Sequence, residues 1–161
     1  ACRNHQWRAD LLQSWADMAS TEGMGSVGKE AARWMIGPRS FRRILPALGS
    51  IGPLQLFNPA NAFVSQVQAI LTTDDRSLNA DLGNIECPTM VVVGNQDILT
   101  PRGDAEEIAS LIPTAELVII SGGAHGLHIE HASTFNRILL EFLGRAEKVF
   151  VPHGHAAAVA V

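Results

Sequence analysis

Two short apolar runs, each followed by a glycine-containing turn, constrain the fold of this chain more than any other feature. The first covers residues 89–93 (Thr-Met-Val-Val-Val) and the second covers residues 117–120 (Leu-Val-Ile-Ile). Continuous short runs rich in β-branched residues are typical of strands that are buried on both faces, as in parallel sheets. A helix that begins at Pro101 and ends near residue 111 is predicted between them, and a last helix is predicted over residues 133–143. This order indicates an α/β fold with a parallel sheet.

The region before these strands, residues 1–80, is predicted to be helical and to contain no strand. Apolar residues recur at helical spacing over residues 5–19, and Ser26 is a candidate cap for a second helix. Two further helices are predicted, one over residues 40–48 and one that begins at Pro59.

Large aromatic side chains are concentrated in this helical region. It contains all 3 tryptophans, Trp7, Trp15 and Trp34, and also Phe63. Packing into a core would explain such residues. The alternative is a helical cap whose inner face binds the apolar part of a substrate, and on this hypothesis the four aromatic residues are candidate substrate-binding residues.

Charge and cysteine content exclude several classes of protein. A net charge of -4 without a long basic run argues against nucleic acid as a partner, and no apolar run reaches the length of about 18 residues that a membrane helix needs. The 2 cysteines, Cys2 and Cys87, are too few for a disulfide scaffold. We expect both thiols to be reduced, with Cys87 buried at the start of a strand, and we expect a cytoplasmic protein.

One titratable residue follows each predicted strand. Asp97 lies just beyond the first run, and His125 lies beyond the second in the loop Gly-Gly-Ala-His-Gly (residues 122–126). Because parallel strands end at the same edge of a sheet, a carboxylate and an imidazole at these positions can form an acid–base pair. The competing interpretations are a turn cap for Asp97 and a solvated loop residue for His125.

Two other arrangements of side chains near His125 compete with this pair. His125, His128 and His131 are spaced by three with Glu130 between them. On a helix, two steps of three residues rotate a side chain by about 120°, so these ligands would converge poorly and no metal site is expected. Glu130 is an alternative to Asp97 as the acid, although it is only five residues from His125 along the same loop.

The stretches that carry the acid and the base resemble a known superfamily. Residues 85–101 (Ile-Glu-Cys-Pro-Thr-Met-Val-Val-Val-Gly-Asn-Gln-Asp-Ile-Leu-Thr-Pro) are similar to the acid-strand motif of the α/β-hydrolases, and residues 124–131 with 135–143 are similar to their histidine loop and final helix. The resemblance covers residues 81–144, and the helical region before them resembles the cap of these enzymes. Among subfamilies, the enol-lactonases and small esterases are the most similar in character.

The resemblance implies a Ser-Asp-His triad that hydrolyses a small carboxylic ester or lactone without a cofactor, with Asp97 as the acid and His125 as the base. The sequence contains no Gly-x-Ser-x-Gly. We therefore expect the serine and the oxyanion donors on a missing N-terminal half, either a second polypeptide or the other part of a nicked chain. The expected division is a cap (residues 1–80), a C-terminal part of the hydrolase core (81–147) and an apolar tail of unknown role (148–161).

Two other functions remain open at this point. One is a hydrolase-like module without catalytic activity that binds a ligand or a partner through its helical cap. The other is cofactor-free haloperoxidase or acyl-transfer chemistry, which uses the same triad.

Overall fold

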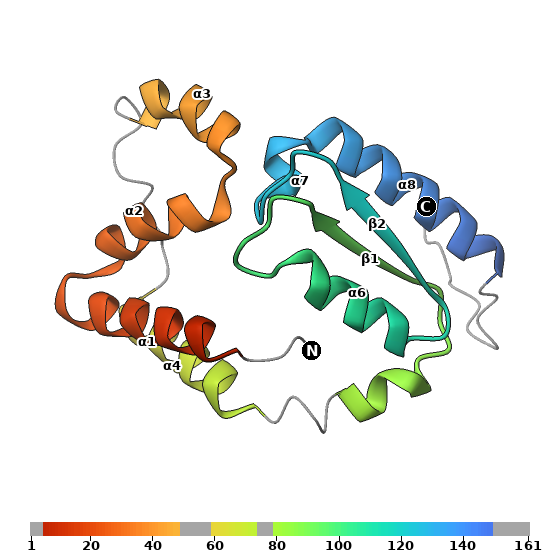
Figure 1. Cartoon of the computed structure of the whole chain (residues 1–161), viewed down its shortest axis with the longest axis horizontal. Coiled ribbons are helices and arrows are strands. Elements are labelled where there is room, and N and C mark those ends of the chain that lie inside the picture. The colour runs from red at the N-terminus through yellow and green to blue at the C-terminus, as the bar shows by residue number, and fades with distance from the viewer. Residues whose placement is uncertain (1–4, 49–58, 74–78, 150–161) are drawn as a thin grey trace, which may run out of the picture.

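The computed structural model describes residues 5–48, 59–73 and 79–149. Its elements divide into a helical unit and a sheet unit, which lie side by side in Figure 1. The helical unit comprises α1 (Gln6–Thr21), α2 (Met24–Met35), α3 (Pro38–Leu48) and α4 (Ala60–Thr72). The sheet unit comprises the 3-10 helix η1 (Leu82–Asn84), β1 (Thr89–Gly94), α6 (Arg102–Leu111), β2 (Ala115–Ile120), α7 (Leu127–Glu130) and α8 (Ala132–Val149).

The two strands form a parallel pair, which confirms the predicted α/β class. Thr89 lies opposite Ala115 and Gly94 lies opposite Ile120, so the strands end at the same level. Helix α6 packs against both strands, and α8 lies on the other side of the sheet (Figure 1). Most strand side chains are half-buried, not fully buried as predicted. In the part of the chain that the structure describes, the sheet has 2 strands, and so narrow a sheet cannot enclose its own apolar residues.

Some helix boundaries differ from those predicted. Helix α2 is preceded by Gly23, whose φ of 88° is readily adopted only by glycine, so the helix begins before Ser26 and that residue is not its cap. Pro59 precedes α4 directly, and α8 continues past Leu143 to Val149. Residues 150–161, which include most of the predicted tail, lie outside the described residues, as does Cys2.

The largest buried cluster lies in the helical unit. Trp15, Ala19, Val27 and Ala31 come from α1 and α2, and Leu99, from the loop after β1, completes the cluster. Leu99 therefore packs the loop that carries Asp97 against helices α1 and α2.

A buried ion pair forms a second connection between the two units. The Arg8 guanidinium of α1 pairs with the Asp104 carboxylate of α6, and both side chains are buried. Arg8 Nε also donates to the carbonyl oxygen of Leu99 at 2.9 Å. One residue of α1 thus holds both α6 and the loop after β1.

Cys87 is a free thiol, as predicted, but it is exposed and not buried, because it lies before β1 at the open end of the sheet. No described helix is both long and apolar enough to cross a membrane.

Candidate active site

The loops that follow β1 and β2 are held together by backbone contacts. The Asn95 amide donates to the Ile120 carbonyl at 3.1 Å, and the Gln96 amide donates to the Gly123 carbonyl at 2.8 Å. Gly94 and Gly123 pack so closely that a Cβ atom on Gly94 would lie 2.1 Å from the Gly123 carbonyl oxygen. Because Gly94 has no side chain, the two loops can approach each other this closely.

This close packing places the two predicted catalytic residues in direct contact. His125 Nδ1 lies 3.0 Å from Asp97 Oδ2. The Asp97 side chain is 4% exposed and the His125 side chain is 32% exposed, so the carboxylate is enclosed while the imidazole can be reached. With Nδ1 donating its proton to Asp97, Nε2 is the nitrogen left to accept a proton, which is the arrangement of an acid–base pair.

Thr100 joins this pair, and the sequence did not reveal its role. The Thr100 hydroxyl donates to Asp97 Oδ2 at 2.8 Å and lies 3.1 Å from His125 Nδ1. Asp97 Oδ1 accepts the backbone amides of Leu99 and Thr100, both at 2.9 Å. An aspartate side chain that accepts backbone amides two and three residues ahead forms an Asx turn. In the sequence, an aspartate in a loop followed by a proline that starts a helix could have indicated this turn and, with it, the position of Thr100.

The same hydrogen bonds keep Asp97 ionised. Burial alone would raise the pKa of the Asp97 carboxyl, but the hydrogen bond from His125 and those from the Thr100 amide and hydroxyl outweigh it. The pKa of Asp97 therefore lies below its usual value of 3.8. At neutral pH the residue is a buried anion beside an imidazole.

Glu130, the alternative acid, is hydrogen-bonded to backbone amides, whereas the described side chain that His125 Nδ1 faces as an acid is Asp97. Its two carboxylate oxygens accept the backbone amides of Gly37 and Ala124, at 2.8 and 2.9 Å. Of the neighbouring histidines, His128 packs edge-on against Phe135. No group of three potential metal ligands occurs among the residues that the structure describes.

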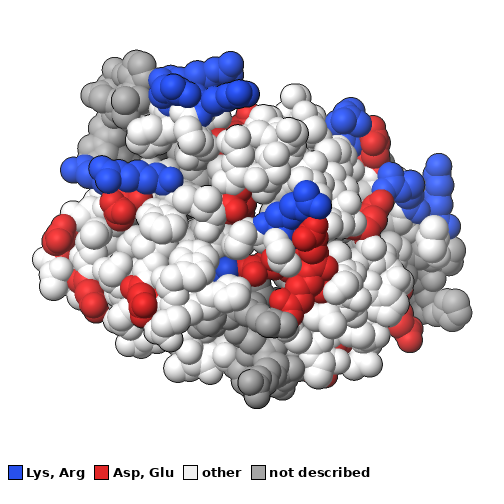
Figure 2. All heavy atoms as spheres, viewed as in Figure 1, with Lys and Arg blue, Asp and Glu red and all other residues white. Residues whose placement is uncertain are grey.

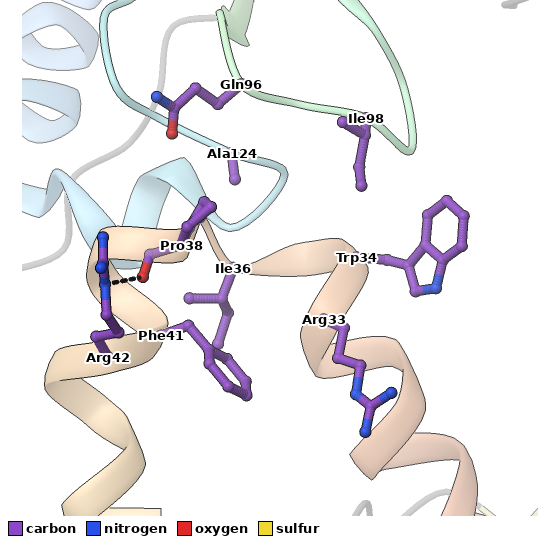
Figure 3. Close-up of a pocket in the computed structure, with 10 residues that line it drawn as sticks. Arg33, Trp34, Ile36, Pro38, Phe41, Arg42, Gln96, Ile98 and Ala124 are labelled. Atoms are coloured by element: carbon purple, nitrogen blue, oxygen red, sulfur yellow. Dashed lines mark hydrogen bonds between the residues drawn. The ribbon is translucent and has the colours of Figure 1, made fainter.

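A cavity of about 800 Å³ lies between the cap helices and the loops after the strands. Ile36, Phe41 and Ile98 give it apolar walls, and Ala124, which precedes His125, forms part of it (Figure 3). Arg33 and Arg42 also line it. The outer surface over α2 and α3 is rich in basic side chains (Figure 2), which are Lys29, Arg33, Arg39, Arg42 and Arg43, all exposed.

The structure places the four predicted substrate-binding aromatics in different environments. Trp34 lines the cavity, and Trp7 stacks on it with ring centroids 6.3 Å apart. Trp15 is 5% exposed in the core of the helical unit, and Phe63 packs against that core. Neither Trp15 nor Phe63 lines the cavity, so core packing accounts for both.

Comparison with known proteins identifies the fold. The family model described as the alpha/beta hydrolase fold matches residues 55–132. The enol-lactonase from Burkholderia xenovorans LB400 superposes with a TM-score of 0.73 at 23% identity, over 84% of this chain and 50% of the enzyme. The chain therefore forms part of an α/β-hydrolase fold.

Two sequence relatives are also similar to parts of this α/β-hydrolase chain. The proposed carbamate hydrolase RutD of Stutzerimonas stutzeri is 30% identical over 87 residues, which are 54% of this chain and 32% of RutD. The serine hydrolase BPHL of Mus musculus is 36% identical over 59 residues, which are 37% of this chain and 20% of BPHL. The α/β-hydrolase chain thus spans about a third or less of the curated relatives that it matches.

Proposed function

We propose that this α/β-hydrolase chain supplies the acid and the base of a Ser-Asp-His triad that hydrolyses a small carboxylic ester or lactone. One observation carries the proposal: at the carboxyl ends of two adjacent parallel strands, buried Asp97 holds the half-exposed His125 through Nδ1. Open α/β sheets bind their ligands at this edge. The likeness to a solved enol-lactonase supports the reaction class.

The serine and the oxyanion donors would come from an N-terminal half of the hydrolase fold, outside these 161 residues. The absence of Gly-x-Ser-x-Gly from the sequence supports this part of the proposal. The described sheet of 2 strands also supports it, because the missing half would add strands beside β1.

In the proposed reaction His125 moves a proton and Asp97 stays charged. Nε2 takes the proton of the serine hydroxyl as the serine oxygen attacks the carbonyl carbon, and it then returns this proton to the departing alcohol oxygen. Water then attacks the acyl-serine and loses a proton to Nε2, which returns that proton to the serine oxygen as the carboxylic acid leaves. The low pKa of Asp97 supports this role, because an ionised carboxylate stabilises the imidazolium at each step.

The cavity would receive the body of the substrate. Its apolar walls, its contact with Ala124 and its position beside the histidine loop fit the acyl or alcohol part of an ester. Of the predicted aromatics, we propose a substrate contact for Trp34, with Trp7 supporting it from behind.

The decisive experiment is to characterise the polypeptides that co-purify with the chain, by intact mass and by labelling with a fluorophosphonate probe for reactive serines. We expect a second polypeptide that carries Gly-x-Ser-x-Gly, takes up the probe and supports turnover of an ester and lactone panel. A folded chain that purifies alone, with no labelled partner and no turnover, would contradict the proposal.

His125→Ala is the accompanying variant, and His128→Ala is its matched control. We expect His125→Ala to lower kcat by a factor on the order of 10³ or more, because the general base is lost. His128 is exposed and packs on Phe135, so its replacement should leave kcat within about twofold. Equal loss in the two variants would exclude a specific role for His125.

A second candidate function is a hydrolase-like module that binds an apolar ligand without reaction. The observation that favours it is that Asp97 and His125 do not line the cavity of about 800 Å³. Ligand binding that is identical in the parent and in His125→Ala, with no turnover in either, would support the module. Haloperoxidase or acyl-transfer chemistry would use the same triad. In the substrate panel it would be seen as transfer of the acyl group to an acceptor other than water.

A further inference from the structure

Three hydrogen bonds join the α2–α3 junction of the cap to the histidine loop (residues 122–126). The Gly126 amide donates to the Met35 carbonyl at 2.6 Å. The Gly37 amide donates to Glu130 Oε1 at 2.8 Å, and the Ala124 amide donates to Glu130 Oε2 at 2.9 Å. The backbone amides on both sides of His125 are therefore tied to the cap, one directly and one through Glu130.

The junction is built for close approach of the two segments. A Cβ atom on Gly37 would lie 3.1 Å from Glu130 Oε1 and 3.3 Å from Gln96 Oε1. A Cβ atom on Gly126 would lie 3.1 Å from the Met35 carbonyl oxygen. A glycine on each side thus lets main chain from the cap and from the loop meet at hydrogen-bonding distance.

Glu130 is suited to this position by its chemistry. An ionised carboxylate has only acceptors, and here each of its oxygens accepts one amide from a different part of the chain. A glutamine would keep one of these bonds and would turn its NH₂ group toward the other amide, so that two donors would face each other. The bridge therefore depends on the charge and the symmetry of the carboxylate.

The same junction forms part of the cavity. Ile36, Gly37 and Pro38 line it from the cap, and Ala124 lines it from the histidine loop; Figure 3 shows Ala124 facing the cap residues. The Glu130 bridge thus joins two parts of the cavity wall, one of which is adjacent to His125. A shift of the cap would be transmitted to the imidazole through this bridge.

We propose that Glu130 is a positioning residue, which couples the cap to the histidine loop and holds His125 in its reactive orientation. This inference rests on the proposed function, since it concerns the placement of the proposed base. Glu130 acts through the backbone on either side of the cavity and does not transfer a proton.

The first test is hydrogen exchange in Glu130→Gln, with Glu141→Gln as the control. Glu141 is an exposed residue of α8 that pairs only with Arg137 in the described structure. We expect exchange of the Gly37 and Ala124 amides to accelerate by about tenfold or more in Glu130→Gln, while amides of α1 keep their protection. Unchanged exchange at both amides would overturn the proposal.

The second readout is the His125 side chain, observed by NMR. The Nδ1 proton that faces Asp97 should shift or broaden in Glu130→Gln and remain unchanged in Glu141→Gln. In the assembled enzyme, kcat should fall on the order of tenfold with KM changing less than twofold, because misplacement of the base affects the reaction more than binding. A rise in KM alone would overturn the positioning role.

A second variant approaches the bridge from the cap. Gly37→Ala places a methyl group against Glu130 Oε1, and it should give the same changes at Ala124 and His125. If Glu130→Gln fails to fold, Gly37→Ala decides by itself, and an unperturbed His125 signal in it would refute the coupling. The exchange and NMR results do not depend on turnover. A parent protein with no esterase activity would therefore refute the proposed function, while the exchange and NMR data would still test the Glu130 bridge.

Discussion

At the scale of single residues, the Asp97 carboxylate organises the site. It accepts two backbone amides, the Thr100 hydroxyl and the His125 imidazole, so its position is fixed from four directions. Asp97 and His125 could be inferred from the sequence because each follows an apolar run and a glycine turn. The role of Glu130 could not, because it depends on which backbone amides face its carboxylate; Gly37 and Glu130 are 93 residues apart.

The first prediction concerns pH. Because the pKa of Asp97 is lower in the folded chain than its usual value of 3.8, its ionised form stabilises the fold at pH values above 3.8. This contribution is lost as the pH falls below 3.8 through the folded pKa. Urea unfolding should therefore show the chain more stable than Asp97→Asn above pH 3.8, with the difference shrinking at lower pH. Asp17→Asn, at an exposed position, is the control.

The second prediction concerns Thr100. Thr100→Val keeps the shape of the side chain and removes the hydroxyl that donates to Asp97, so we expect kcat of the assembled enzyme to fall about tenfold. Thr100→Ser retains the hydroxyl and should recover most of the activity. A Thr100→Val enzyme with unchanged kcat would show that the remaining bonds to Asp97 are sufficient.

At the scale of elements, the alignment of the two loops depends on the ends of β1 and β2. The apolar runs predicted both strands, but the half-burial of the strands reflects the narrow sheet and could not be seen in the runs themselves. Nor did helical spacing separate the tryptophans of the core from the one at the cavity, since Trp15 and Trp34 both fit an apolar helix face.

The third prediction tests the contact between the strand ends. Gly94→Ala would place its methyl carbon 2.1 Å from the Gly123 carbonyl oxygen and 2.8 Å from that of Ala124, and backbone atoms cannot yield easily. We expect the free energy of unfolding to fall by about 3 kcal/mol, measured by urea titration. Gly103→Ala is the matched control: it lies in α6 with no atom within 4 Å of the new carbon, so it should be neutral or slightly stabilising.

At the scale of the whole molecule, several contacts among the described residues join the helical unit to the sheet unit. They include the Leu99 contact, the Arg8–Asp104 pair, the Met35–Gly126 hydrogen bond and the Glu130 bridge. The family resemblance predicted a cap and a core, and the α/β-hydrolase fold is confirmed. The contacts between the two units could not be predicted. They join residues that are far apart in the sequence, and these residues do not recur at helical or strand spacing.

The fourth prediction concerns the buried ion pair. Arg8→Met should lower the free energy of unfolding by about 3–5 kcal/mol, because the buried Asp104 loses its guanidinium partner and keeps the longer contact with His5 at 3.7 Å. The double variant Arg8→Met/Asp104→Leu removes both charges and should recover most of this loss. Failure of the second substitution to restore stability would assign the effect of the first to packing and to the lost bond with Leu99.

The outer edge of β1 is where the proposed N-terminal half would add its strands. A second cavity, of about 280 Å³, is lined by Val91, Val92 and Val93 and continues to Asp97 and His125. A strand that added in parallel along this edge would complete the hydrogen-bonding ladder and, by the same register, bring the residue after its own carboxyl end to the imidazole. Binding of the N-terminal half and activation would then be a single event. Turnover would depend on the concentration of that half in the same way as its binding does. No bound but inactive state would accumulate.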